Sequence, residues 1–386
     1  MKTFLPNILC ALIFVFSLNS CSKTDPTSPD NGNSTSTLSG KVIYNFGLDD
    51  RDTNRIIYAY DLQSGSNSPI VKGNVYCFTK PEKNKVPYIR SYFNNAMNKH
   101  LYQIEIYDFL ANKSDIISST ERNPMKNIFR GYSYVALTPD AKSIVYVFDS
   151  TNTNTTLYQN RKLVVRNLES NRTIVLAKEV AKEQYFKISP DSKYIVYFGG
   201  EGSSSFGNDE IYISSLDGTF EKKLDVDTKY MYDFGTWFEW SPDSKYLICV
   251  NQERDKIIVV NTNTWLKEKE IDCSSTGGVV GFPIFIDNLS IALISIKREN
   301  QKVTTRLFSY SLIDNVFTAL DVNIENELLF KLNPTAKNGT LVFSTIPTNA
   351  TELDIFRNNQ IYLYNAKDKS IKKIGEKSSF DFFLFD

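Results

Sequence analysis

The residue types that most often carry catalytic chemistry are scarce in this chain. His100 is the only histidine among 386 residues, and the five cysteines contain no CxxC pair. A structural zinc site needs a cluster of cysteine and histidine, so the sequence argues against one. A serine hydrolase needs a G-x-S-x-G elbow and a histidine, and no such elbow is present. Carboxylate chemistry stays open, because two acidic residues suffice to hydrolyse a glycoside.

Three charged residues lie in short apolar runs whose other members are expected to be interior. Lys187, Glu239 and Lys331 each stand three positions before the proline of a turn. A charge is seldom buried unless it is paired or hydrated. Two positions earlier, four of the equivalent runs carry a large aromatic residue: Tyr76, Tyr134, Tyr185 and Trp237. These seven residues are the candidate ligand-binding set, and the elements that hold them come from a repeat.

The repeat consists of an apolar run, a tight turn and a second apolar run. Near-copies are Leu137–Tyr146 (LTPDAKSIVY), Ile188–Tyr197 (ISPDSKYIVY) and Trp240–Cys249 (WSPDSKYLIC). Ser or Thr followed by Pro suits a type I turn, and the next Asp can accept hydrogen bonds from nearby backbone amides. Weaker copies surround Pro81, Asn288 and Pro334. The pattern predicts strand, turn and strand.

A second recurring element, a short apolar strand, gives the number of repeats. Short apolar strands followed by a polar turn begin at Ile56, Ile104, Leu163, Ile211, Ile257, Leu307 and Ile361. They are spaced roughly fifty residues apart, and each is followed by another short strand. Four strands in each such unit predict a propeller blade. The sequence therefore predicts an all-β fold, a seven-bladed β-propeller of four-stranded antiparallel blades.

The two series also predict how the ring closes. Only one strand, Lys41–Tyr44, precedes Ile56, so the first blade lacks its innermost strand. The chain ends with Phe380–Asp386 (FDFFLFD), which reads as such a strand. We expect this C-terminal strand to complete the N-terminal blade, because closure removes free sheet edges.

The Ser189–Lys193 and Ser241–Lys245 segments resemble the Ser-Pro-Asp-Gly-Lys turn of the TolB-like propeller family, with Ser in place of Gly. The resemblance covers roughly residues 40–386 and implies a propeller, while fold alone does not imply function. TolB proteins usually have six blades and an extra N-terminal domain, whereas this chain has seven repeats and no room for that domain. Polysaccharide lyases that resemble this family rely on several histidines and a metal, which His100 alone cannot supply.

The N-terminus predicts a lipoprotein. Lys2 precedes an apolar run that is too short to span a bilayer and has the length of a signal-peptide core. Leu18-Asn19-Ser20-Cys21 resembles the lipobox of bacterial lipoproteins, which implies removal of residues 1–20 and acylation of Cys21. The alternative is an ordinary secretory signal. Residues 21–38 are rich in Ser, Thr, Asn and Pro and predict a flexible tether, and residues 39–386 form the propeller.

The amino-acid composition limits the classes of partner that the chain is expected to bind. Acidic and basic residues balance at 44 each, so neither nucleic acid nor an anionic membrane is an expected direct partner of the body. Cys77 and Cys249 lie in apolar runs, where a thiol behaves as a small hydrophobic group. We expect a monomeric body without a cofactor or metal, attached to the outer membrane by its lipid and facing either the periplasm or the cell surface.

The functional prediction is a non-catalytic envelope protein that binds a protein partner or a glycan. The ligand would stack on an aromatic rim formed by Tyr76, Tyr134, Tyr185 and Trp237, over a channel that holds Lys187, Glu239 and Lys331. In the alternative interpretation, the aromatic residues pack between blades and the charges form structural salt bridges. A glycan-degrading enzyme, either a carboxylate-based glycosidase or a lyase, is the competing functional class.

Three further motifs are weaker candidates. Asp50–Asn54 resembles the start of a calcium loop, but it lacks the glycine and the closing glutamate, so a polar hairpin tip is expected. Asp149-Ser150-Thr151 resembles a short acceptor motif for O-glycosylation. His100 lies in a polar stretch and is expected to be an exposed loop residue.

Overall fold

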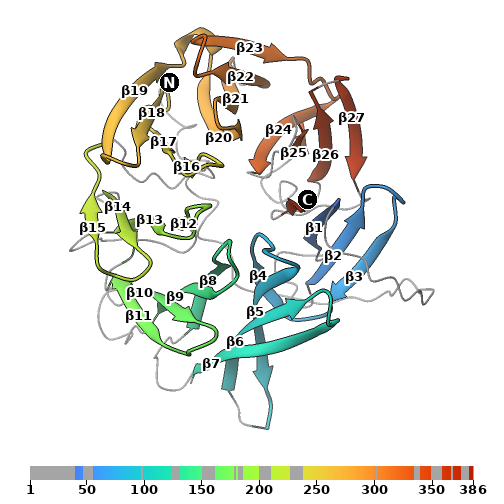
Figure 1. The fold of residues 1–386 in the computed structure, drawn as a ribbon. Coiled ribbons are helices and arrows are strands. Elements are labelled where there is room, and N and C mark those ends of the chain that lie inside the picture. Colours follow the sequence, from blue (N-terminus) through green and yellow to red (C-terminus); the bar gives the residue numbers. More distant parts are fainter. Residues whose placement is uncertain are drawn as a thin grey trace, which may run out of the picture.

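The computed structural model describes residues 40–46, 55–96, 99–122, 131–149, 161–177, 180, 186–199, 210–226, 238–300, 302–333, 340–348, 359–366, 368–374 and 382–385. These residues form seven four-stranded antiparallel sheets arranged as blades around a central opening (Figure 1). A short 3₁₀ helix, η2 (Ser274–Thr276), joins two of the blades. Within the described ranges, no helix is long and apolar enough to cross a membrane. The predicted seven-bladed β-propeller is confirmed.

The blades are numbered along the chain, and their strands are given from the centre of the ring outward. Blade 1 contains β28 (Phe382–Phe385), β1 (Lys41–Phe46), β2 (Ile56–Asp61) and β3 (Asn67–Val71). Blade 2 contains β4 (Val75–Phe78), β5 (Lys85–Asn94), β6 (Lys99–Asp108) and β7 (Lys113–Arg122). Blade 3 contains β8 (Gly131–Leu137), β9 (Ser143–Asp149), β10 (Arg161–Asn167) and β11 (Thr173–Ala177).

The remaining four blades follow the same order. Blade 4 contains β12 (Phe186–Ile188), β13 (Tyr194–Gly199), β14 (Glu210–Ser215) and β15 (Glu221–Lys223). Blade 5 contains β16 (Phe238–Trp240), β17 (Tyr246–Val250), β18 (Lys256–Asn261) and β19 (Leu266–Asp272). Blade 6 contains β20 (Val279–Asp287), β21 (Ser290–Glu299), β22 (Lys302–Ser311) and β23 (Val316–Leu320). Blade 7 contains β24 (Glu327–Asn333), β25 (Thr340–Pro347), β26 (Gln360–Asn365) and β27 (Ser370–Ile374).

The C-terminal strand closes the ring as the sequence predicts. β28 pairs antiparallel with β1, and Phe382 stands opposite Tyr44. Phe382 is fully buried, and its backbone carbonyl accepts a hydrogen bond from the side-chain amide of Asn333 in blade 7. The last strand therefore supplies the innermost position of the first blade and also joins that blade to its other neighbour.

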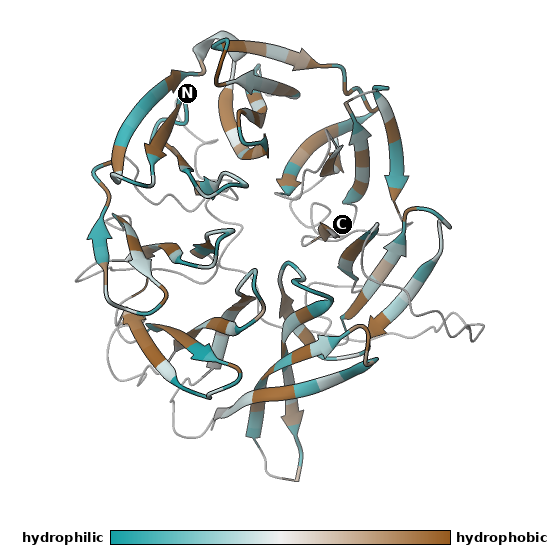
Figure 2. Ribbon diagram, in the orientation of Figure 1, coloured by the Kyte–Doolittle hydropathy of each residue, from teal (hydrophilic) through white to brown (hydrophobic). Residues whose placement is uncertain are grey.

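The apolar core is divided among the seven junctions between neighbouring blades. Alternation along the strands places apolar residues on both faces of each blade, where they pack against the next blade. Figure 2 shows the hydrophobic residues along the strands of the ring. At the junction that closes the ring, Val42 of blade 1 packs with Val342 and Ile361 of blade 7. Fully burying a side chain of this size contributes roughly 1.5–3 kcal/mol. The three described cysteines, Cys77, Cys249 and Cys273, are buried in this core, which confirms the prediction for the first two.

The Ser-Pro-Asp turns fold as their chemistry predicts. In blade 4, the Ser192 amide donates to the Ser189 carbonyl (2.9 Å), and the Ser189 hydroxyl donates to Asp191 Oδ1 (2.6 Å). Asp191 Oδ1 also accepts a hydrogen bond from the Lys193 amide (3.2 Å). Ser192 has a φ of 60°, in the left-handed region that the family motif assigns to glycine.

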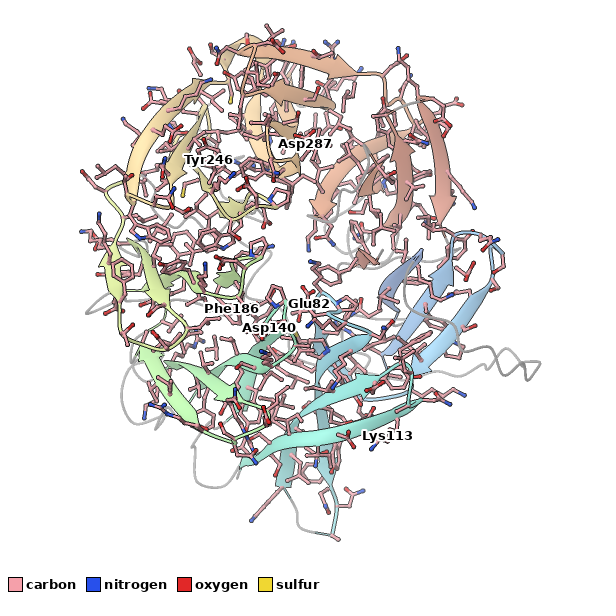
Figure 3. The ribbon with its side chains drawn as sticks, viewed as in Figure 1. Glu82, Lys113, Asp140, Phe186, Tyr246 and Asp287 are labelled. Atoms are coloured by element: carbon pink, nitrogen blue, oxygen red, sulfur yellow. The ribbon has the colours of Figure 1, made fainter. Side chains whose placement is uncertain are left out.

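Serine at that position connects neighbouring blades. The Asp140 amide of blade 3 donates to Ser192 Oγ (3.0 Å), and the Asp191 amide of blade 4 donates to Ser244 Oγ (3.0 Å). The Asp243 amide of blade 5 donates to Asn288 Oδ1 of blade 6 (2.9 Å). Figure 3 shows Asp140, Asp287 and Glu82, which come from three of these turns, beside the central opening. The turns form a hydrogen-bonded series from blade 3 to blade 6.

The antiparallel strands give the ring two different faces. The turns from the first to the second strand and from the third to the fourth strand of each blade lie on one face, which we call the turn face. The innermost strands begin on the opposite face, which we call the loop face. Connections between the second and third strands, and between successive blades, lie there. Of the candidate residues, Tyr76 and Tyr134 stand farther from the innermost turns and so nearer the loop face. Lys187 and Glu239 stand two residues before the turns that begin at Ser189 and Ser241, toward the turn-face end of their strands.

Candidate functional site

The structure places two of the predicted charges in one ion pair. Lys187 comes from β12 and Glu239 from β16, the innermost strands of adjacent blades, and Lys187 Nζ lies 3.0 Å from Glu239 Oε2. The Glu239 side chain is only 8% exposed, whereas that of Lys187 is 29% exposed. Glu239 Oε1 accepts a hydrogen bond from the Trp240 amide on the free edge of β16 (3.1 Å). The carboxylate is therefore held on both sides.

A neighbouring tryptophan fixes the same two strands. Trp240 is 4% exposed, and its indole Nε1 donates to the Lys187 carbonyl (3.1 Å). Lys187 thus takes part in two contacts with blade 5, one through its ammonium group and one through its backbone. A carboxylate fixed in this way can orient a ligand or hold the neighbouring strand. For Lys187 and Glu239, these contacts agree with the alternative interpretation that the charges form a structural salt bridge.

Lys331 lies apart from that pair. It belongs to β24 of blade 7, and the whole of blade 6 separates it from Glu239. Lys331 is half-buried and stands opposite Ser344 in the ladder between β24 and β25. Ser344 is 1% exposed, and its Oγ has no hydrogen-bond partner within the described part of the chain. The three predicted charges therefore do not meet as one cluster.

Tyr76 is the described rim residue that faces solvent. A register shift between Val75 and Cys77 leaves Tyr76 as the extra residue of β4, and such bulges redirect a side chain. Its side chain is 45% exposed and lies edge-on to the ring of Tyr102, with 6.5 Å between the ring centroids. Arg55 Nη1 donates to the Tyr76 carbonyl (3.4 Å). The result is an exposed Tyr76 beside a half-buried Tyr102, near the start of the innermost strand of blade 2.

Tyr134 occupies the same sequence offset but packs inward. In β8 the register shift falls between Tyr132 and Tyr134, so Ser133 is the extra residue. Tyr134 is half-buried, and its ring meets that of Phe186 in blade 4 edge-to-face at 4.8 Å. Two residues at the same distance before the proline are therefore structurally equivalent only if the bulges of their strands fall at the same position. Tyr134 fits the alternative interpretation, packing between blades.

Several predicted residues lie outside the described residues. These are Tyr185, Trp237, the acylation residue Cys21, the calcium-like segment 50–54 and the pair Ser150 and Thr151. Their proposed roles remain predictions.

His100 was expected in an exposed loop, and this expectation was wrong. It lies in β6 opposite Phe93 of β5, and the two rings are 4.9 Å apart. The polar residues around His100 predicted a loop, but β5, β6 and β7 are each 10 residues long and include them. His100 is half-buried, so it is a packed strand residue.

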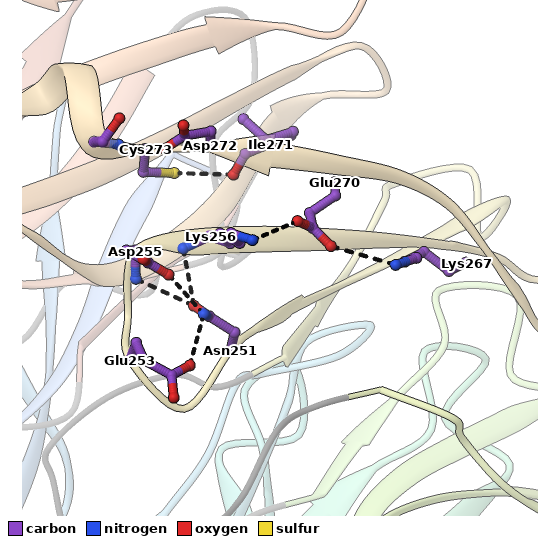
Figure 4. A network of polar contacts seen from close by, with 10 residues as sticks. Asn251, Glu253, Asp255, Lys256, Lys267, Glu270, Ile271, Asp272 and Cys273 are labelled. Carbon is purple, nitrogen blue, oxygen red and sulfur yellow. Dashed lines mark hydrogen bonds and ion pairs between the residues drawn. The ribbon is translucent and has the colours of Figure 1, made fainter.

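Sequence reasoning missed a basic group at the rim of blade 6. Asn251 holds the connection between β17 and β18, where its amide donates to Glu253 Oε2 (3.0 Å) and Asp255 Oδ1 (2.6 Å) (Figure 4). The enclosed Arg254 has a φ of 60°, and its Nε donates to the Val280 carbonyl (2.7 Å). A Cβ on Gly281 would stand 3.3 Å from Arg254 Nη2.

Gly281 is the sequence feature that could have indicated this group, because blade 6 has glycine at the strand position where four other blades have an aromatic residue. The guanidinium of Arg254 lies where the larger side chain would have been.

The described residues offer neither a metal centre nor an activated thiol. Among them, no group of three His, Cys, Asp or Glu side chains is placed to hold a metal ion. Burial raises the pKa of the Cys273 thiol to about 12, and burial raises that of Cys249 further. A thiol at such a pKa is protonated at neutral pH and is a poor nucleophile.

No protein-family model matches this chain, and no curated protein matches it in sequence. Its fold, however, resembles solved propellers. The propeller domain of the Trilobed protease from Pyrococcus furiosus is 13% identical, with 84% of this chain and 87% of that one covered and a TM-score of 0.53. Oligogalacturonate lyase in complex with manganese is 11% identical, covering 80% and 82%, with a TM-score of 0.51. TolB from Acinetobacter baumannii is 15% identical, covering 89% and 81%, with a TM-score of 0.44.

These similarities concern the fold alone. The similar structures include TolB proteins as well as enzymes, and they neither confirm nor exclude catalysis by this chain.

Proposed function

We propose that this chain is a non-catalytic lipoprotein of the cell envelope that binds a protein partner or a glycan at the loop-face mouth of its propeller. The observation that carries the proposal is the exposed Tyr76 near the start of an innermost strand, in edge contact with the half-buried Tyr102. A tyrosine offers a rigid apolar ring and a polar hydroxyl, which suits a surface that alternates between water and ligand. Tyr76 is the extra residue of a bulge, and 45% of its side chain is exposed to solvent.

Polar groups of the innermost strands and of the rim would orient the ligand. Lys187 keeps 29% of its side chain exposed while its partner Glu239 is buried, so the exposed part of the pair is cationic. Arg254 adds a guanidinium at the rim of blade 6. Binding sites usually combine apolar walls with a few fixed polar groups of this kind.

The lipid anchor rests on the Leu18–Cys21 motif. Cys77, Cys249 and Cys273 are buried in the folded body, which leaves Cys21 as the candidate for acylation among the cysteines after residue 20. Several acyl chains on one residue would hold the protein stably at a membrane. Mass spectrometry of the membrane-extracted protein would test this, because acylation of Cys21 adds a defined hydrophobic mass to the N-terminal peptide.

The binding proposal is tested by a screen of purified protein against a panel of polysaccharides, with binding and product release read in parallel. Tyr76→Ala should abolish binding while leaving the melting temperature unchanged. Ile116→Ala, at a residue that is 61% exposed on the outermost strand of the same blade, is the matched control and should bind normally.

If the partner is a protein, a photo-crosslinking residue at position 76 should capture it, and the same group at position 116 should not. Product release that is lost in Glu239→Gln would overturn the non-catalytic assignment. Binding that survives Tyr76→Ala would move the site away from this mouth.

A further inference from the structure

The body of the propeller begins on the turn face. In blades 2 to 6, the amide of a residue at the start of the third-to-fourth-strand turn donates to the carbonyl just before the second strand, as from Leu216 to Lys193 and from Leu312 to Leu289. In blade 1 the equivalent bond runs from the Leu62 amide to the Gly40 carbonyl (3.0 Å). Gly40 therefore occupies the turn-face position of the first blade, and any chain that precedes it leaves from that face.

The same face carries exposed aliphatic side chains. On blade 6, Leu289, Ile313 and Val316 are 45%, 66% and 54% exposed, and Leu266 on the adjoining edge of blade 5 is 61% exposed. The hydrogen bond from the Leu312 amide to the Leu289 carbonyl (2.8 Å) brings the two turns of blade 6 together.

Lys269 of blade 5 joins this group from the neighbouring blade. Its Nζ donates to the Leu312 carbonyl (3.4 Å) and to the side chain of Asn315. These contacts join β19 of blade 5 to the turns of blade 6 that carry Leu289, Ile313 and Val316. We call Leu266, Leu289, Ile313 and Val316, the exposed aliphatic residues on the turn face of these two blades, the aliphatic patch. Neighbouring exposed apolar groups, unlike isolated ones, indicate an interaction surface.

Exposed lysines lie on the turn face of the adjoining blades 4 and 5. The side chains of Lys193, Lys245 and Lys267 are 70%, 68% and 53% exposed. The carboxylate partners of Lys193 and Lys245, Asp191 and Asp243, are 32% and 23% exposed, and Glu270, the partner of Lys267, is 38% exposed. Aliphatic tips with outward lysines match the boundary between lipid headgroups and acyl chains.

We propose that the turn face rests on the bilayer that holds Cys21, with the aliphatic patch dipping into the headgroup layer. This inference depends on the lipid anchor of the proposed function. The expected tether of residues 21–38 would span only about 20–25 Å if flexible, so it keeps this face close to the lipid. A contact that is weak on its own becomes populated at such an effective concentration. The loop face, with Tyr76, then points away from the membrane and stays free for a partner.

The test couples the mature chain to vesicles through the Cys21 thiol. The vesicles contain phosphatidylethanolamine and phosphatidylglycerol with a small share of maleimide-bearing lipid, and the other thiols are buried. Hydrogen–deuterium exchange is compared with that of the same chain quenched with a soluble maleimide. Exchange should slow in the turn-face segments 287–289 and 312–315 and stay unchanged in the loop-face segment 251–255. Slower exchange in the loop-face segment, or no change in either, would overturn the proposal.

Two variants sharpen the result. Leu289→Ser and Ile313→Ser should each weaken vesicle contact about fivefold, judged from the apolar area of a half-exposed aliphatic side chain. Val279→Ser, at a 39% exposed residue on the loop-face side of blade 6, should have no effect. Equal protection in the Leu289→Ser variant would instead assign the protection to tether crowding and contradict the patch.

The outcome separates this inference from the proposed function. Because the coupling is chemical, it does not depend on acylation in the cell, and partner binding at Tyr76 is measured without vesicles.

Discussion

The two faces of this propeller differ in how they are built. On the turn face, one hydrogen-bonding scheme recurs: the Ser192 and Ser244 hydroxyls each accept a bond from the amide of the preceding blade's aspartate. Toward the loop face, Tyr76 and Arg254 each hold their place through different contacts. The recurring contacts of the turn face hold neighbouring blades together, while the loop face carries the diverse side chains that ligand recognition requires.

The ion pair between the innermost strands of blades 4 and 5 gives the largest expected effect. Lys187→Met should lower the free energy of unfolding by about 3 kcal/mol, because it leaves the buried Glu239 carboxylate without its cation. Glu239→Gln should cost less, about 1 kcal/mol, since Lys187 is partly exposed and the amide oxygen can still accept from Trp240. Urea unfolding of both variants measures the difference. Equal losses would show that burial of Glu239 does not dominate the pair.

The two tyrosines at the same sequence offset give the next largest effect. Tyr134→Ala should destabilise the protein by about 2 kcal/mol, because the ring fills the junction between blades 3 and 4. Tyr76→Ala should change stability by less than about 0.5 kcal/mol, as expected for an exposed residue. Thermal melts of both variants provide the comparison. A large loss in Tyr76→Ala would make Tyr76 a packing residue and weaken the binding proposal.

The turn face can be probed at two positions with the same backbone conformation. Ala141 and Ser192 have φ values of 57° and 60°, but Ser192 alone of the two carries a hydroxyl that binds the preceding blade. Ala141→Gly should stabilise by about 1 kcal/mol by relieving the left-handed strain. Ser192→Gly should be near neutral, because the relief offsets the lost hydrogen bond. Equilibrium unfolding checks the pair, and equal gains would mean that the bond contributes nothing.

The sequence predicted most of the fold because the fold is repetitive. The seven third strands, the Ser-Pro-Asp turns and the closing strand at Phe382–Phe385 all follow from short local patterns that recur. Each prediction needed only the period of the repeat and the chemistry of one turn. The closing strand followed because the first blade lacked one strand and the chain ended with one.

The candidate site was less predictable because it depends on departures from the repeat. The bulges fall at Tyr76 in β4 and at Ser133 in β8, so equal offsets from the proline give different side-chain directions. No local pattern shows where a bulge will fall. Arg254 reaches its position from a neighbouring blade, and a contact between residues distant in sequence leaves no spacing to detect.

The smallest expected effect is the loss of folding stability at acidic pH that arises from Asp243. Burial acts to raise the pKa of Asp243, but hydrogen bonds from the Ser241 hydroxyl and from the Lys245 amide and ammonium outweigh it, so the pKa is lowered. A carboxyl with a lowered folded-state pKa stabilises the protein above its unfolded pKa of about 3.9 and loses that contribution as the pH falls through the folded value. Wild type should therefore lose slightly more stability between pH 6 and pH 3 than Asp243→Asn, by less than about 1 kcal/mol. Urea unfolding at the two pH values measures this, and a larger loss in the variant would place the acid-sensitive group outside the turns.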